Sequence, residues 1–122
     1  MIHAPSYMKS LQLQGLNRLA QVNIPVPVPL EDEVLIKTEV ATICTSDLHD
    51  IKTNAFGIKY PRVMGHEGAG VIVACGSDVT EYTPGTRVAV HPVVPCRACP
   101  ECLRGLEHLC SHMSHLGIDR DG

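Results

Sequence analysis

The chain has 122 residues, a length that suits one domain able to fold without disulfide bonds. Hydrophobic residues make up 44%, with one Phe and no Trp, so we expect an aliphatic core rich in valine. The net charge of −3 and the lack of a basic run argue against a nucleic-acid partner. No secretory leader or membrane-spanning apolar run is recognisable, so we expect a cytoplasmic protein without a membrane partner.

Short strands separated by turns dominate the predicted secondary structure. Residues 34–41 alternate, with Val34 and Ile36 on one face and Lys37 on the other, which predicts a half-buried strand. The expected strands are residues 34–41, 71–74 and 87–91, the expected turns 25–29, 76–78 and 84–86, and the expected helical turns 46–51 and 99–105. This succession of short strands is typical of a mainly β barrel or sandwich.

Four cysteines within fifteen residues form the densest group of reactive side chains: Cys96, Cys99, Cys102 and Cys110. Their C-x2-C-x2-C-x7-C spacing favours a tetrahedral Zn²⁺ with four thiolate ligands. An iron–sulfur cluster is the nearest alternative. Bacterial ferredoxins, however, place the last cysteine after a shorter gap and follow it with proline, whereas Ser111 follows Cys110 here. Disulfide pairing is a further alternative, disfavoured in a reducing compartment.

A sparser group of reactive residues lies upstream, in segments 43–49 and 65–70. Cys44 follows a predicted strand, and His66 and Glu67 lie among glycines that let the backbone turn tightly. Singly, such a cysteine is usually a small buried hydrophobe, and such a His-Glu pair is usually exposed and inert. Together they offer a thiolate, an imidazole and a carboxylate, the ligand types of a catalytic zinc with an open position.

These motifs resemble the N-terminal catalytic domain of the zinc-dependent alcohol dehydrogenases, in the medium-chain dehydrogenase/reductase family. The family signature G-H-E-x2-G-x5-G-x2-V is met by Gly65, His66, Glu67, Gly70, Gly76 and Val79, and the four-cysteine segment follows at the expected place. The resemblance begins at about residue 8 and continues to residue 122. It implies a GroES-like, partly open β-barrel over residues 1–122, with a projecting structural-zinc lobe at about 95–112.

The resemblance also implies two zinc ions with different roles. Cys44 and His66 would bind a catalytic zinc, with Glu67 as a direct ligand or a close neighbouring carboxylate. This zinc would polarise the hydroxyl or carbonyl of a small-molecule substrate for hydride transfer, the activity of an oxidoreductase. A second, closed zinc would fold the lobe through Cys96, Cys99, Cys102 and Cys110.

Three further residues receive roles from the same resemblance. Ser46 would pass the substrate's hydroxyl proton outward, with His49 as a later member of the relay. Asp47 would orient the imidazole of His66 and fix its tautomer. The sequence of residues 44–49 and 117–122 leans toward the polyol and threonine dehydrogenases over enzymes of simple ethanol oxidation.

The chain departs from the family in what it lacks. No G-x-G-x-x-G motif within a βαβ unit is present, so we expect no Rossmann domain, and NAD(P) would bind only with a nucleotide-binding domain. The remaining catalytic-zinc ligand is expected beyond residue 122. We therefore expect the isolated chain to be inactive. The alternative is a stand-alone, non-enzymatic zinc-binding module that self-associates, and in either case we expect a homo-oligomer.

Three histidines near the cysteines are interpreted as surface residues. His108, His112 and His115 are spaced as if on one helical face. Four thiolates already complete a tetrahedron, so an additional metal site is not expected there.

Overall fold

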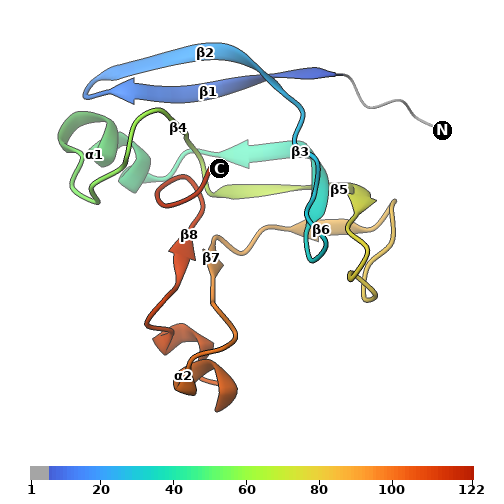
Figure 1. The fold of residues 1–122 in the computed structure, drawn as a ribbon. Helices are drawn as coiled ribbons and strands as arrows, with labels where there is room; N and C mark the ends of the chain where they lie inside the picture. The colour runs from blue at the N-terminus through green and yellow to red at the C-terminus, as the bar shows by residue number, and fades with distance from the viewer. Residues whose placement is uncertain (1–5) are drawn as a thin grey trace.

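The computed structural model describes residues 6–122, which form three antiparallel sheets and three short helices (Figure 1). The strands are β1 (Tyr7–Gly15), β2 (Arg18–Pro25), β3 (Val34–Thr42), β4 (Arg62–Val63), β5 (Glu67–Cys75), β6 (Arg87–Ala89), β7 (Val93–Val94) and β8 (Ser114–His115). The helices are α1 (Thr45–Thr53), α2 (Pro100–Leu103) and the 3-10 helix η1 (Glu107–Leu109). The expectation of a mainly β protein is confirmed.

The first sheet has the strand order β2-β1-β4 and begins with a hairpin that is not among the expected strands. β1 and β2 pair from Tyr7 opposite Pro25 to Gly15 opposite Arg18. Asn17 closes the hairpin with a φ of 55°, in the left-handed region that asparagine tolerates better than most residues. The hairpin lies across the top of the molecule in Figure 1.

The second sheet has the order β3-β5-β6 and contains the three strands that the sequence predicted. The predicted half-burial of β3 holds only at its start: Val34 and Ile36 are half-buried, but the strand is exposed from Lys37 onward, and Val40 is 56% exposed. β5 starts at Glu67, four residues before the expected strand, because it pairs with β3 along the whole length of β3.

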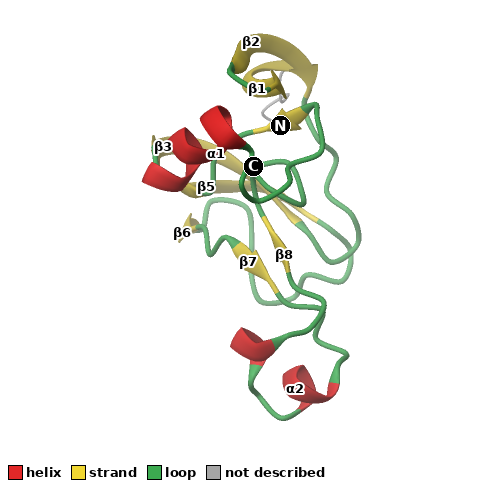
Figure 2. Ribbon diagram, turned by 90° about the vertical axis from the view of Figure 1, so that its left-hand side faces the viewer, coloured by secondary structure: helices red, strands yellow, loops and turns green. Residues whose placement is uncertain are grey.

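A two-stranded sheet, β7 with β8, forms the neck of a separate lobe. Figures 1 and 2 show this lobe, with α2 at its tip, projecting away from the other two sheets. Pro100 begins α2. Proline suits this position, because the first N–H groups of a helix have no partner within the helix and the missing one is not needed. The helical turns predicted at 46–51 and 99–105 are thus confirmed as α1 and α2.

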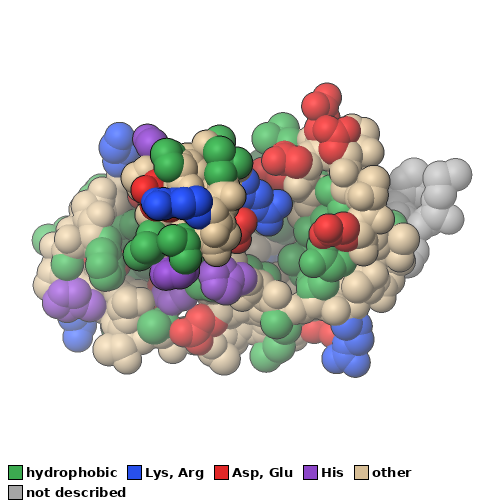
Figure 3. Space-filling view, turned by 90° about the horizontal axis from the view of Figure 1, so that it is seen from below, with side chains coloured by type: hydrophobic (Ala, Val, Ile, Leu, Met, Phe, Trp, Pro, Cys, Tyr) green, Lys and Arg blue, Asp and Glu red, His purple; other side chains and the backbone are tan. Residues whose placement is uncertain are grey.

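The buried core is small and aliphatic, as expected, but it is not rich in valine. Its apolar residues outside the lobe are Leu13, Ile58, Val63 and Ile72. Most valines lie at half-buried or exposed positions of the strands, since a sheet with one open face buries few of them. Seen from the side of the lobe, hydrophobic, cationic and histidine side chains are interspersed on the surface (Figure 3). In the described residues 6–122, no helix is long and apolar enough to cross a membrane.

Candidate metal centres

The pairing of β3 with β5 brings Cys44, His66 and Glu67 together. The two strands run antiparallel, and their register ends with Thr42 opposite Glu67. Cys44 therefore lies just past the end of β3, beside His66, which precedes β5. Gly65, with a φ of 108°, makes the turn into this position. One ligand atom from each of the three side chains lies within 4.8 Å of the others.

Asp47 links Cys44 to His66 from the first turn of α1. Its Oδ2 accepts a hydrogen bond from the backbone N–H of Cys44 at 3.0 Å, at the start of the helix. Its Oδ1 lies 3.2 Å from Nδ1 of His66, but the atoms are not aligned as a hydrogen bond, so the contact is an ion pair or dipole contact. Nε2 of His66 faces the other way, 3.9 Å from Oε1 of Glu67.

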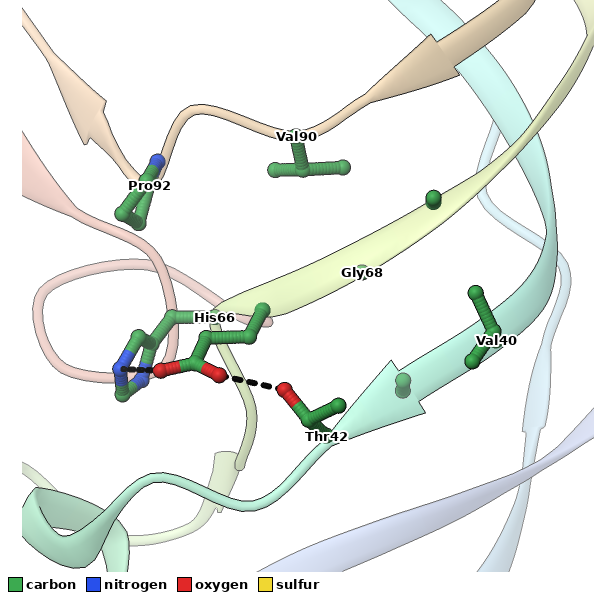
Figure 4. A pocket seen from close by; sticks show the side chains of 9 residues that line it. Val40, Thr42, His66, Gly68, Val90 and Pro92 are labelled. Carbon is green, nitrogen blue, oxygen red and sulfur yellow. Dashed lines mark hydrogen bonds and ion pairs between the residues drawn. The ribbon is translucent and has the colours of Figure 1, made fainter.

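Glu67 is held between the side chains of His66 and Thr42, both of which are labelled in Figure 4. The Thr42 hydroxyl donates a hydrogen bond to Oε2, which leaves Oε1 facing the imidazole. This bond, followed by one from Cys44, lowers the pKa of the Glu67 carboxyl below its ordinary value. Glu67 is therefore a carboxylate at neutral pH, in the state required of a metal ligand.

A pocket of about 320 Å³ opens beside these residues. His66, Glu67 and Thr42 supply its polar wall. Its apolar wall consists of Val40, Ala41, Ala69, Val90 and Pro92. A concave site with a few converging polar groups in an apolar surround is the usual form of a small-molecule site.

Ser46 and His49 lie on α1 three residues apart, which places them as neighbours on the helix surface. Ser46 is half-buried and His49 is exposed. Across residues 6–122, neither side chain makes a hydrogen bond to Cys44, His66 or Glu67. The structure thus places Ser46 in the first turn of the helix that Cys44 precedes and His49 at its middle, without joining either to the cluster.

The four cysteines of the lobe converge in the same way. Their sulfur atoms all lie within 4.8 Å of one another, and those of Cys96 and Cys102 are 4.0 Å apart. Thiolates around a tetrahedral zinc lie about 3.8 Å apart, given Zn–S bonds of about 2.3 Å. Cys99, Cys102 and Cys110 are buried, and Cys96 is exposed. All six cysteines of the chain are free thiols in the structure.

Backbone N–H groups point at these sulfurs. Cys99 donates to Sγ of Cys96 at 3.3 Å, and Cys96 donates to Sγ of Cys110 at 3.3 Å. Donors from Cys102 and Ser111 lower the pKa of the Cys99 thiol to about 6, whereas burial raises the pKa of Cys102 to about 12. The first cysteine thiol of the lobe therefore ionises readily, whereas ionisation of further thiols is unfavourable until a cation balances their negative charge.

The prediction for the three histidines is partly wrong. Residues 111–115 form a turn and a short strand rather than a helix, so the three do not share a helical face. His108 and His112 are exposed as expected. His115 is half-buried, and its ring meets that of His66 edge to face, with centroids 5.1 Å apart. The sequence carried no signal for this contact, because it depends on the placement of β8.

Comparisons with known proteins agree with the motifs and the fold. The family model of the alcohol dehydrogenase GroES-like domain matches residues 30–122. L-galactonate-5-dehydrogenase of Escherichia coli K12 is 37% identical over 117 residues, 96% of this chain and 34% of that protein. Galactitol 1-phosphate 5-dehydrogenase of the same strain is 40% identical over 117 residues, 94% of this chain and 33% of that protein.

Solved structures give the same result. A crystal structure of an alcohol dehydrogenase (rspB) from Escherichia coli CFT073, complexed with NADH, superposes with a TM-score of 0.88 at 41% identity. The match covers 97% of this chain and 34% of that one, so the chain spans about a third of the length of the relatives that it matches. The mainly β fold is thus a GroES-like fold, and no Rossmann domain is present among residues 6–122. The chain belongs to the alcohol dehydrogenase family, through the GroES-like domain of its zinc-dependent members.

Proposed function

We propose that the chain is the zinc-binding catalytic domain of an NAD(P)-linked dehydrogenase that acts on a hydroxyl or carbonyl group of a small polyol or related substrate. The observation that carries this proposal is the convergence of Cys44, His66 and Glu67 beside a pocket. A thiolate, an imidazole and a carboxylate suit zinc, and three protein ligands leave a position open. The polyol preference is supported by the likeness to L-galactonate and galactitol 1-phosphate dehydrogenases.

In this proposal each residue of the site has a separate task. A zinc ion, when bound, supplies Lewis acidity that lowers the pKa of the substrate hydroxyl. Cys44 and His66, through the Nε2 that faces Glu67, would hold the ion, and Glu67, fixed by Thr42, would be a third ligand or an adjacent carboxylate. Asp47 accepts the N–H of Cys44 and faces Nδ1 of His66, so it orients both ligands.

Proton release and hydride transfer would involve different parts of the protein. We propose that Ser46 receives the hydroxyl proton and passes it to His49, whose exposed ring delivers it to water. Residues 6–122 contain no βαβ unit, so NAD(P) requires a nucleotide-binding domain. The isolated chain is therefore expected neither to bind NAD(H) nor to oxidise alcohols, and turnover by the pure chain would contradict this.

The lobe would bind the second zinc in a purely structural role. The close approach of the four sulfurs, all within 4.8 Å of one another, supports a single ion over a four-iron cluster. Four thiolates fill the coordination sphere, so a substrate has no position to occupy. Zinc in this lobe would hold the segment from about 95 to 112 in its folded form.

Native mass spectrometry with cysteine variants tests both assignments. We expect two zinc ions per chain, one held tightly and one weakly. Cys99→Ser should lose the tight ion, and Cys44→Ser should lose the weak one. The matched control is Cys75→Ser, because Cys75 is a half-buried thiol outside both clusters, and this variant should retain two. A wild-type chain without zinc, or a Cys44→Ser variant with both ions, would refute the assignment.

A second candidate is a stand-alone zinc-binding module that self-associates. The observation in its favour is the number of large apolar side chains left exposed, such as Val40 at 56%, Leu103 at 75% and Leu109 at 56%. On this reading the lobe ion is the functional one. Light scattering showing a homo-oligomer, together with a Cys44→Ser variant that behaves like the wild type, would favour it.

A further inference from the structure

His115 is in contact with His66, and the proposed function gives it no task. It lies in β8, at the neck of the lobe, far along the chain from His66. The two rings pack edge to face, with centroids 5.1 Å apart and planes at 71°. The His66 side chain is only 8% exposed, so this contact is part of the wall that surrounds it.

The ring of His115 is itself fixed by its own segment. Its Nδ1 lies 2.8 Å from the carbonyl oxygen of Leu116, and since a carbonyl only accepts, Nδ1 carries the hydrogen. Its backbone N–H donates to Oδ2 of Asp119 at 2.8 Å. Its carbonyl accepts N–H groups from Ile118 and Asp119 at 3.2 and 2.9 Å. A ring held in this way can restrain a neighbour.

The segment 116–122 is fastened to the strand that leads into His66. Oδ1 of Asp121 accepts the backbone N–H of Val63 at 3.0 Å, and the N–H of Gly122 donates to the carbonyl of Val63 at 3.0 Å. Gly117 lies so close to Gly65 that a Cβ there would be 2.7 Å from the carbonyl oxygen of Gly65. His115 and His66 thus belong to two segments that are held together next to the ring contact, through residues 117–122 and 63–65.

His66 needs such a restraint, because its contact with Asp47 does not fix the ring plane. The Asp47 carboxylate lies 3.2 Å from Nδ1, but without the alignment of a hydrogen bond, and a contact at one atom leaves the imidazole free to tilt. A perpendicular ring packed against it removes that freedom, since edge-to-face contacts depend on the angle between the rings.

We propose that His115 is a positioning residue for His66: its ring fixes the imidazole plane so that Nε2 faces the point shared with Cys44 and Glu67. This inference rests on the proposed function, because it takes Cys44, His66 and Glu67 to be metal ligands. Loss of the ring should loosen metal at that site by about tenfold, the lower end of the effect of losing a partner that orients a ligand. The four-cysteine site should be unaffected.

Cobalt titration of the full chain tests the proposal without requiring catalysis. Co²⁺ reports on each site by its absorption, and the thiolate charge-transfer band of the lobe shows that a variant is folded. We expect His115→Ala to bind the second Co²⁺ about tenfold more weakly, with a changed d–d spectrum. His115→Phe keeps an aromatic edge and should restore affinity to within about threefold of the wild type, the smaller residual loss reflecting the missing bond to Leu116. The control is His108→Ala, an exposed histidine away from His66.

The possible outcomes distinguish a failure of the positioning role of His115 from a failure of the proposed function. If the wild type binds one Co²⁺, or if Cys44→Ser still binds two, the proposed function fails and this inference with it. If the wild type binds two, Cys44→Ser loses one, and His115→Ala matches the wild type in affinity and spectrum, only the positioning role is refuted. A His115→Phe variant as weak as His115→Ala would also refute it, because the ring contact would then not be the cause.

Discussion

Replacing Asp47 by asparagine tests whether one carboxylate orients two ligands. Its two oxygens face two different ligands: Oδ2 accepts the N–H of Cys44 at 3.0 Å, and Oδ1 lies 3.2 Å from Nδ1 of His66 without the alignment of a hydrogen bond. Asparagine has nearly the same shape but a single acceptor oxygen. Its NH2 group must therefore face the N–H of Cys44 or Nδ1 of His66. With Nε2 as the metal ligand, Nδ1 carries a hydrogen, so either choice sets donor against donor.

We expect Asp47→Asn to weaken zinc at the Cys44, His66 and Glu67 site by at least about tenfold, or about 1.4 kcal/mol. Loss of a residue that orients a ligand has this effect because the imidazole is both misdirected and made less basic. The assay is competition for zinc with a chromophoric chelator, resolving the weak ion from the tight one. The affinity of the lobe should not change.

Asp50→Asn is the matched control, on the same helix and with the same change of atoms. Asp50 is also buried, at 1% exposure, but within residues 6–122 only its Oδ1 accepts a backbone hydrogen bond, from Phe56 at 3.0 Å. An asparagine oxygen can keep that bond, so zinc affinity should remain at the wild-type level. If Asp47→Asn retains wild-type affinity, or if both variants lose it equally, Asp47 does not orient the ligands.

Three more predictions follow from the geometry. Thr42→Val should raise the pKa of Glu67 toward its ordinary value, because the main hydrogen bond that lowers this pKa is lost. The measurement is a ¹³C NMR titration of the metal-free chain, and an unchanged pKa of Glu67 would contradict the prediction. Zinc binding to the lobe at neutral pH should release at least one proton, because the pKa of Cys102 is raised to about 12 and its thiol must ionise to bind the metal. The zinc affinity of the lobe should therefore fall as the pH falls. Calorimetry in buffers of different ionisation enthalpy measures the number of protons released. Gly117→Ala should lower the free energy of unfolding by more than Gly57→Ala, which should lower it by about 1 kcal/mol. Both glycines have positive φ, 77° and 69°, but of the two only Gly117 lacks space for a Cβ. Equal urea midpoints for the two variants would contradict this.

Much of the second sheet was predictable because its signals are local. Alternation along residues 34–41 and 87–91 and the turns between strands require no knowledge of the rest of the chain. The hairpin of β1 and β2 was missed although Leu11 and Leu13 alternate with polar residues. Leu11 is 48% exposed and Leu13 is fully buried, so the two apolar residues of one face have different surroundings that no local pattern shows. The predicted half-burial of residues 34–41 failed beyond Ile36 for the same reason, with Val40 56% exposed.

Local sequence patterns also predicted only part of the candidate metal sites. Spacing alone located the four cysteines of the lobe, because a single short segment of the chain carries all of them. Cys44, His66 and Glu67 were grouped by their ligand types and by a family resemblance, and the structure brings them together through the register of β3 and β5. Their role as ligands stays a prediction. The contact of His115 with His66 could not be foreseen, since it joins segments that meet only in the folded chain.

The four-cysteine site and the site at Cys44, His66 and Glu67 are expected to form at different stages of folding. Cys96 and Cys110 are separated by 14 residues, whereas Arg62 and Asp121, which fasten segment 116–122 beside His66, are separated by 59. Closing the longer loop loses about 1.3 kcal/mol more chain entropy than closing the shorter one. The lobe is therefore expected to close first, and a metal ion taken up there organises β7 and β8 before His115 reaches His66. Folding intermediates of this chain should carry metal in the lobe while the other site is still open.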